Sequence, residues 1–447
     1  MTWSPSSWEA RRTAQEVIYP DQDELDAALA RLRTLPPLVT SWEIDRLKAL
    51  LRDAQEGKRF LLQGGDCAET LAGCQPSVIE NNLKILLQMS LVMIHGGRKP
   101  VIRVGRMAGQ YAKPRSKPVE VRDGVSHPSY FGDLVNRLEF DPEARTPDPW
   151  RMLEGYTHAA MTLNFVRSLS AAGFADLHHP EYWDLAFLSG ADLSDELRAQ
   201  YRATTHQLAA ALEFMEALGE GTVDELTRVE FFTSHEGLNL PFEAAQTREV
   251  PHGDGFYDHT THLPWIGERT RALDGAHVEF FRGIRNAVGV KVGPTATPEE
   301  VIAVAKALNP EGEPGKLVLI TRLGVDKVEE RLPVLVEGTR RAAIPALWVC
   351  DPMHGNTRLS AGGVKTRSFG DILQEIERSF EIHAGCGSHL GGVHFELTGE
   401  DVTECTGGGL DDADLDRNYA SACDPRLNYR QSLEMAFAIA RKMGAGR

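Results

Sequence analysis

Eight short apolar runs punctuate the chain between residues 60 and 397. Each run is almost continuously apolar and is bounded by Gly, Pro or polar residues. This pattern is typical of strands that are buried on both faces, as in a parallel sheet. The runs are 60-FLLQGG, 100-PVIRVG, 229-VEFFTS, 262-HLPWIG, 288-VGVKVG, 316-KLVLIT, 346-ALWVCD and 392-GVHFEL. The pattern therefore predicts eight strands of one parallel sheet.

Helical periodicity fills most of the intervals between these runs. It predicts helices over 78–94, 270–287, 301–308 and 327–343. Ser77 and Glu80 have the spacing of a capping box, as have Thr297 and Glu300, and Pro298 stands at a first helical position. Eight strands that alternate mostly with helices favour an α/β fold of the closed (β/α)8 TIM-barrel type. A doubly wound open sheet is the alternative, but it more often shows a GxGxxG sequence, which this chain lacks.

Two segments do not fit the simple barrel repeat. Residues 1–57 carry apolar residues at helical spacing, and we expect them to form an N-terminal helical extension ahead of a catalytic barrel over 58–447. The interval between the second and third runs is far longer than an ordinary connection, and it predicts a loop-plus-helices insertion over 107–228. Its periodicity predicts helices near 150–172 and 192–218, and we expect regulation or assembly to depend on this insertion.

Composition narrows the class of protein. Of 447 residues, 42% are hydrophobic and 25% are charged, which is ordinary for a globular protein. The net charge of −16 disfavours nucleic acid as a partner, because phosphate backbones need clustered Lys and Arg. No apolar stretch is long enough for a membrane span, and the N-terminus does not look like a secretory signal. Six cysteines without zinc-site spacing favour a reducing compartment, so a cytoplasmic location is expected.

Polar residues stand at the end of almost every apolar run. In a (β/α)8 barrel the chemistry lies at the carboxyl ends of the strands, so these side chains should meet in one place. Four of them are cations, namely Arg106, Arg269, Lys291 and Arg322. Converging cations in an acidic protein predict a pocket for a multiply charged anion, such as a phosphate together with a carboxylate.

Three further strand-end residues have the chemistry of metal ligands. Cys67, His354 and Glu396 offer a thiolate, an imidazole and a carboxylate, a set that suits manganese, iron, cobalt or zinc. Their separations in the sequence are long, so no local motif supports them. A buried cysteine that acts as a small hydrophobe and a structural histidine in a Gly-rich turn therefore remain open alternatives.

Several of these stretches together resemble the type II (plant-like) 3-deoxy-D-arabino-heptulosonate 7-phosphate (DAHP) synthases. The matching stretches follow the family order from the first expected strand to near the C-terminus. They are 62-LQGGDCAET, 103-RVGRMAGQYAKPRS, 234-SHEGL, 265-WIGERTR, 289-GVKVGP, 349-VCDPMHGNT, 392-GVHFELTGEDVTEC and 422-ACDPRLNYRQSLE. The resemblance implies the same barrel, with N-terminal helices and an insertion after the second strand.

The resemblance also implies roles for individual residues. The metal ligands it implies are Cys67, His354, Glu396 and Asp424. The phosphoenolpyruvate site it implies comprises Arg106, Glu268, Arg269, Lys291 and Arg322. The residues it implies for erythrose 4-phosphate are Lys113, Arg115 and Ser116. It further implies that Glu236 is an active-site carboxylate. For the catalytic set of Glu268, Lys291 and Glu236, our hypothesis is that Glu268 orients or deprotonates a water molecule, with Lys291 as the alternative.

The activity that the resemblance implies is the condensation of phosphoenolpyruvate with D-erythrose 4-phosphate to DAHP and phosphate. This is the first step of the shikimate pathway to chorismate and the aromatic amino acids. The expected cofactor is a divalent metal, Mn2+ first and Co2+ second. An aromatic amino-acid effector (Trp, Phe or Tyr) and a homo-oligomer, dimer or tetramer, are also expected. The alternatives are a metal-dependent aldolase acting on a phosphorylated sugar and a catalytically inactive barrel kept for regulation.

The implied ligands carry one more expectation. Cys423 directly precedes Asp424, so two ligands on one metal would bring Cys423 near Cys67. A disulfide needs α-carbons roughly 4.4–6.8 Å apart. We therefore expect the two thiols to lie near disulfide range, and metal-free enzyme to lose activity in air.

Overall fold

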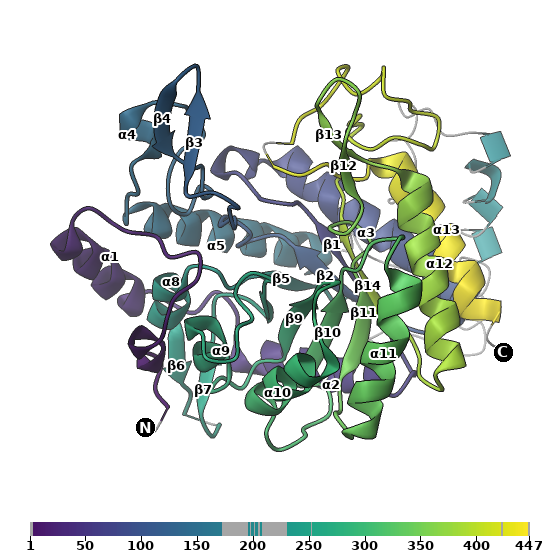
Figure 1. Ribbon diagram of the computed structural model, residues 1–447, viewed down its shortest axis with the longest axis horizontal. Coiled ribbons are helices and arrows are strands. Elements are labelled where there is room, and N and C mark those ends of the chain that lie inside the picture. Colours follow the sequence, from purple (N-terminus) through teal and green to yellow (C-terminus); the bar gives the residue numbers. More distant parts are fainter. Residues whose placement is uncertain are drawn as a thin grey trace.

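A computed structural model describes residues 3–171, 230–251, 253–421 and 423–445, together with short pieces between 195 and 207 (Figure 1). Within these residues the eight expected strands form a closed parallel barrel in the order β1-β14-β11-β10-β9-β8-β5-β2. The strands are β1 (Phe60–Gly65), β2 (Val101–Arg106), β5 (Phe232–Glu236), β8 (Leu263–Ile266), β9 (Val288–Val292), β10 (Leu317–Thr321), β11 (Leu347–Cys350) and β14 (Gly392–Glu396). The TIM-barrel prediction is confirmed, and the open sheet is excluded.

Helices surround the barrel and precede it. They are α1 (Gln22–Thr34), α2 (Ser41–Gln55), α3 (Pro76–Gly97), α4 (Pro142–Arg145), α5 (Arg151–Ala171), α8 (Leu240–Ala245), α9 (Ala276–Phe281), α10 (Pro298–Leu308), α11 (Val328–Arg341), α12 (Phe369–Gly385) and α13 (Tyr429–Ala445), with 3-10 turns η1 (Ser7–Ala10) and η2 (Leu71–Gly73). Helix α5 confirms the helix expected near 150–172. Most of the helix expected over 192–218 lies outside the described residues. Among the described residues, no helix is long and apolar enough to cross a membrane.

Two helix predictions need correction. Helix α3 begins at Pro76 with Gln75 as its N-cap, so Ser77 makes no capping box, whereas the box of Thr297 and Glu300 on α10 is present. The helix expected over 270–287 is only the short α9. Gly283 follows it and lies against the ring of Trp3, where a Cβ would come within 1.9 Å of the indole. The Trp3 indole also donates to the backbone carbonyl of Glu279 at 2.9 Å, so a distant segment packs against the end of this helix.

Helix α2 closes the amino-terminal end of the barrel. Its residues Leu47, Leu51 and Ala54 are buried in one cluster with side chains from inside the barrel, among them Val104 and Val318. The apolar stripe of this helix therefore completes the barrel core. The N-terminal extension is in this respect part of the barrel.

Three two-stranded hairpins project from the barrel. They are β3 (Val119–Arg122) with β4 (Val125–Pro128), β6 (Thr247–Glu249) with β7 (Phe256–Asp258), and β12 (Thr357–Leu359) with β13 (Lys365–Arg367). The first lies in the expected insertion, and the third follows β11 and the loop that carries His354. In Figure 1 the first and third hairpins stand on the same upper side of the molecule, at the carboxyl ends of the barrel strands.

Candidate active site

The carboxyl ends of the barrel strands open into one cavity of about 630 Å³. Every site residue named from the sequence lines it. These thirteen residues are Cys67, Arg106, Lys113, Arg115, Ser116, Glu236, Glu268, Arg269, Lys291, Arg322, His354, Glu396 and Asp424. Side chains separated by up to 357 positions thus meet because the parallel strands all end at one rim.

The four proposed metal ligands lie in one part of this cavity. Single donor atoms of His354, Glu396 and Asp424 all lie within 4.8 Å of one another, and His354 Nε2 is 2.9 Å from Glu396 Oε1. The Sγ atom of Cys67 is 3.6 Å from Oδ2 of Asp424. An imidazole, two carboxylates and a thiolate at such spacing fit a divalent transition metal.

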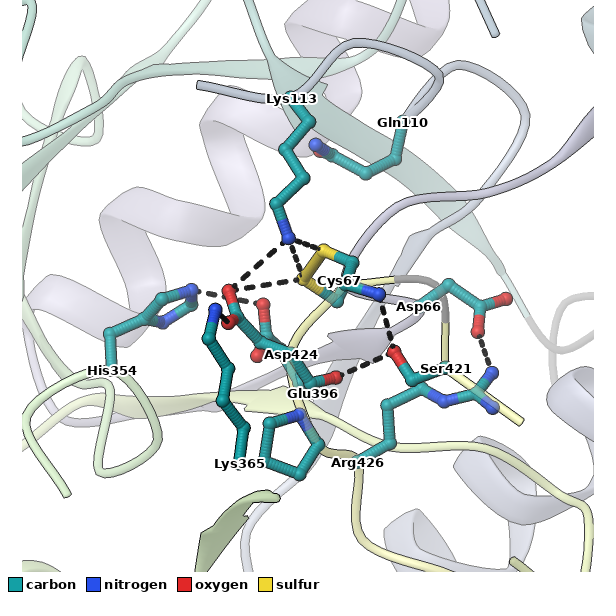
Figure 2. The surroundings of a disulfide bond; sticks show 12 residues. Asp66, Cys67, Gln110, Lys113, His354, Lys365, Glu396, Ser421, Asp424 and Arg426 are labelled. Carbon is teal, nitrogen blue, oxygen red and sulfur yellow. Dashed lines mark hydrogen bonds and ion pairs between the residues drawn. A yellow bond between two sulfur atoms is a disulfide. The ribbon is translucent and has the colours of Figure 1, made fainter. Parts of the chain in front are cut away.

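Cys67 is joined to Cys423 by a disulfide, with 6.5 Å between the two α-carbons (Figure 2). The expected proximity of these thiols is therefore confirmed. A sulfur in a disulfide is no thiolate, and the thiolate is the form that binds a metal. Cys67 can complete the ligand set only when this bond is reduced.

Asp351 orients the imidazole of His354 toward the other ligands. His354 Nδ1 donates to Oδ2 of Asp351 at 2.7 Å, which leaves Nε2 pointing at Glu396. Lys291 Nζ contacts the same carboxylate oxygen. Burial lowers the pKa of Lys291 to about 8, although Asp351 opposes that shift. A carboxylate behind a ligand histidine is the usual support of a metal site.

Glu396 is held by two arginines. Its side chain is fully buried, with Arg106 Nη2 at 3.1 Å from one oxygen and Arg367 Nη1 at 2.6 Å from the other. Burial alone would raise the pKa of Glu396, but His354 and the two guanidinium groups hold it well below its usual range. Glu396 is therefore a carboxylate that is ready to bind a cation.

Two lysines lie against Asp424. Lys113 Nζ is 3.5 Å from Oδ2, and Lys365 Nζ is 2.9 Å from Oδ1, as Figure 2 shows. Lys113 also contacts the sulfur of Cys423, and burial lowers its pKa to about 8. The resemblance assigned Lys113 to the aldose phosphate, yet in the structure it points at the metal ligands.

The two glutamates expected to act in catalysis differ in their surroundings. Both oxygens of Glu268 accept from the Arg271 guanidinium, at 3.0 and 3.1 Å, and one also accepts from Gly293 N–H at 2.7 Å. Glu236 is buried in the cavity wall, and its Oε1 has no hydrogen-bond partner within the described part of the chain. Burial raises the pKa of Glu236, with Lys291 opposing. Of these two glutamates, Glu236 is therefore the one with a carboxylate oxygen that accepts no hydrogen bond from the described residues.

The remaining cations line the outer part of the cavity. Arg269 Nη2 donates to Ser116 Oγ at 3.1 Å, which joins the two segments assigned to different substrates. Arg322 Nη2 donates to the backbone carbonyl of His354 at 2.8 Å. The Arg115 backbone is held by the side chain of Gln15 at 2.6 Å. These contacts fix the positions of the cations before any substrate binds.

A family model described as the class-II DAHP synthetase family matches residues 3–440. The chain belongs to this family. Three curated relatives named phospho-2-dehydro-3-deoxyheptonate aldolase match nearly their whole length. That of Neurospora crassa is 46% identical and covers 98% of this chain and 94% of its own. That of Streptomyces coelicolor is 46% identical, and the match covers 98% of this chain and 97% of the relative. The AroG protein of Mycolicibacterium smegmatis is 44% identical, and the match covers 94% of this chain and 90% of the relative.

A solved structure supports the fold of this chain. The phospho-2-dehydro-3-deoxyheptonate aldolase of Francisella tularensis superimposes with a TM-score of 0.53 over 97% of this chain and 98% of its own. Only 12% of the residues are identical. This likeness therefore concerns the barrel alone.

Two residues of the candidate site were not predicted from the sequence. Lys365 and Arg367 contact Asp424 and Glu396, and both lie on the β13 strand of a short hairpin. No apolar run ends at this hairpin, so the pattern that identified the other residues does not extend to it. Asp351 does stand at a strand end, but its contacts with His354 and Lys291 could not be predicted from that position.

Proposed function

We propose that this chain condenses phosphoenolpyruvate with D-erythrose 4-phosphate and water to give DAHP and inorganic phosphate. The observation that carries the proposal is one cavity lined both by the cations of four strand ends and by the Cys-His-Glu-Asp donor set. Membership of the class-II DAHP synthetase family across residues 3–440 supports it. The product is then the first intermediate on the route to chorismate and the aromatic amino acids.

Phosphoenolpyruvate carries a phosphate and a carboxylate, and the cations of the cavity match both. We assign its binding to Arg106, Arg269, Lys291 and Arg322, with Glu268 holding Arg271 beside them. Guanidinium groups bind such anions with two parallel hydrogen bonds, which fixes the face of the enol. Arg115 and Ser116 lie on the outer side, where the phosphate of the aldose would bind, with Lys113 deeper at the metal ligands.

Cys67, His354, Glu396 and Asp424 would hold a divalent metal once the disulfide is reduced. Mn2+ is the first candidate and Co2+ the second, because a thiolate ligand favours transition metals over Mg2+. Such a metal supplies a Lewis acid that polarises the aldehyde of erythrose 4-phosphate. Lys113 and Lys365 keep Asp424 ionised, since their charges lower its pKa against the effect of burial.

We assign the proton transfer at C2 to Glu236. Carbon C3 of phosphoenolpyruvate forms the new bond to the aldehyde carbon, whose oxygen takes up a proton. Water then adds at C2, the C2–O bond to phosphate breaks, and the hydroxyl left at C2 gives up its proton as the keto group forms. Glu236 lines the cavity and forms no ion pair among the described residues, so we assign the proton of that water to its carboxylate, whereas both oxygens of Glu268 are occupied by Arg271. Lys291 lies close enough to Glu236 to act on its charge, and it can return a proton to the departing phosphate.

Phosphate release tests this proposal directly. Reduced protein is mixed with both substrates, with and without excess chelator, and inorganic phosphate and DAHP are measured together. We expect phosphate and DAHP in equal amounts, loss of both with chelator, and recovery with Mn2+ or Co2+. Full activity in chelator would contradict the metal assignment. An aldol product without phosphate release would support the alternative aldolase.

The other expectations extend this proposal. We propose a cytoplasmic homo-oligomer, dimer or tetramer, in which the barrel spans 58–447 and the insertion over 107–228 responds to Trp, Phe or Tyr. Phosphate release in the presence of each amino acid, alone and in pairs, tests the effector. Sedimentation equilibrium tests the oligomeric state.

A further inference from the structure

A buried glutamate organises the loop that carries Asp424. Glu404 is fully buried, and its carboxylate accepts backbone N–H groups from Ser421 at 2.8 Å and from Arg426 at 2.7 Å. The residues between these two, Cys423 and Asp424 among them, therefore turn around a single carboxylate. Backbone N–H groups that converge on one anion fix the shape of the loop.

Arg426 extends this arrangement to a second loop. Its guanidinium donates to Glu404 through Nε at 3.1 Å and Nη2 at 2.8 Å, while Nη1 lies 2.5 Å from Oδ1 of Asp66. The other oxygen of Asp66 accepts from Asn82 on α3 at 3.3 Å. Arg426 is mostly buried and spans the two carboxylates, as Figure 2 shows for Asp66.

The two loops that Arg426 joins are those of two proposed metal ligands. Asp66 directly precedes Cys67, and Arg426 follows Asp424 by two residues. The segment after Arg426 is tied to β14, because Leu427 N–H donates to the carbonyl of Glu396 at 3.0 Å. The contact between Arg426 and Asp66 is thus a second link between these loops, and it does not involve the Cys67–Cys423 disulfide.

We infer that Arg426 is a positioning residue, which holds the Cys67 loop and the Asp424 loop at the spacing that one metal ion requires. The inference rests on the proposed metal site. An arginine suits this task because its planar fork meets two carboxylates in fixed directions, which the point charge of a lysine cannot do. A buried ion pair is weak evidence for stability, so orientation is the better account of this group.

Co2+ binding to the reduced, metal-free protein tests the inference without any substrate. Cobalt alone is titrated, and both its visible bands and its thiolate charge-transfer band are recorded. Wild type is expected to show both, and Cys67→Ser only the visible bands. Arg426→Gln is expected to weaken Co2+ binding about 10- to 100-fold and to lower the charge-transfer band relative to the visible bands.

Asp66→Asn is the second variant, because it weakens the contact between the loops and leaves Glu404 and Arg426 paired. The same changes in affinity and charge transfer are expected, and this variant decides the matter if Arg426→Gln does not fold. Arg417→Gln is the matched control, since Arg417 forms an exposed ion pair with Asp414 at 3.0 Å in the same part of the chain. We expect it to bind Co2+ as wild type does.

The outcomes separate the inference from the proposed function. If wild type shows no charge-transfer band that depends on Cys67, the proposed metal site is wrong and the inference is lost with it. If wild type shows the band and the folded Arg426→Gln and Asp66→Asn variants match it in affinity and spectrum, the metal site stands. Arg426 then has no positioning role.

Discussion

Oxidation and metal binding should compete for the same sulfur. In the structure Cys67 is bonded to Cys423, and the proposed ligand set needs Cys67 as a thiolate. Air or a mild disulfide oxidant applied to reduced, metal-free protein should therefore form this bond and weaken metal binding, because only His354, Glu396 and Asp424 remain as ligands. This oxidation removes the thiols of Cys67 and Cys423, which are two of the six in the chain. The other four cysteines stay as free thiols, namely Cys74, Cys350, Cys386 and Cys405.

Mass action gives the factor by which bound metal should slow the formation of the Cys67–Cys423 disulfide. Only protein without metal presents a free Cys67 thiolate, so the oxidation rate should scale with the metal-free fraction. At a free metal concentration 100 times the dissociation constant this fraction is about 1%, which corresponds to about 2.7 kcal/mol. Disulfide formation should then be about 100 times slower than in metal-free protein.

The assay counts thiols in denatured samples taken during oxidation at several Mn2+ concentrations. Six thiols per chain should fall to four, and a plot of the rate against the metal-free fraction should be a straight line through the origin. Activity should return with reductant plus metal, and with neither alone. The Cys423→Ser variant should keep its activity in air, whereas Cys74→Ser, which removes a half-buried cysteine outside the pair, should behave as wild type.

Two outcomes would refute this reasoning. The first is an oxidation rate that does not depend on the concentration of Mn2+, because Cys67 would then be no metal ligand. The second is equally fast inactivation of metal-free Cys423→Ser and wild type. In that case the Cys67–Cys423 disulfide would not be the cause of the loss.

Three further predictions concern single side chains. Arg269→Ala should raise the KM for phosphoenolpyruvate about ten- to a hundredfold through the loss of a contact worth about 1.5–3 kcal/mol; an equal rise for both substrates would contradict its assignment. Glu236→Gln should lower kcat about 100-fold or more with little change in KM, and Glu268→Gln should lower it less, as steady-state kinetics can show. Burial raises the pKa of Glu375 to about 8. Its folded form therefore keeps a proton that the unfolded chain loses near pH 4.5, and stability should fall between these pH values by at most roughly 5 kcal/mol. Glu375→Gln should flatten that decline in melting temperatures measured from pH 5 to pH 8.

The fold could be predicted because its main signal is local. A strand buried on both faces must be apolar throughout, so each of the eight barrel strands is visible as a short run such as that of β10. Parallel strands that close into a barrel end at one rim, and this places Arg106, Lys291 and Glu396 together without further information. Asp424 lies beyond the last strand, so only the resemblance identified it.

What the tertiary structure decided depends on contacts between distant segments. Arg271 pairs with Glu268 and leaves Glu236 as the free carboxyl group, and side-chain direction alone determines that choice. Trp3 packs against Gly283 just after the short helix α9, and the β12–β13 hairpin brings Lys365 to the metal ligands. Such contacts leave no periodic trace in the sequence, because they depend on where the closed barrel brings loops and turns into contact.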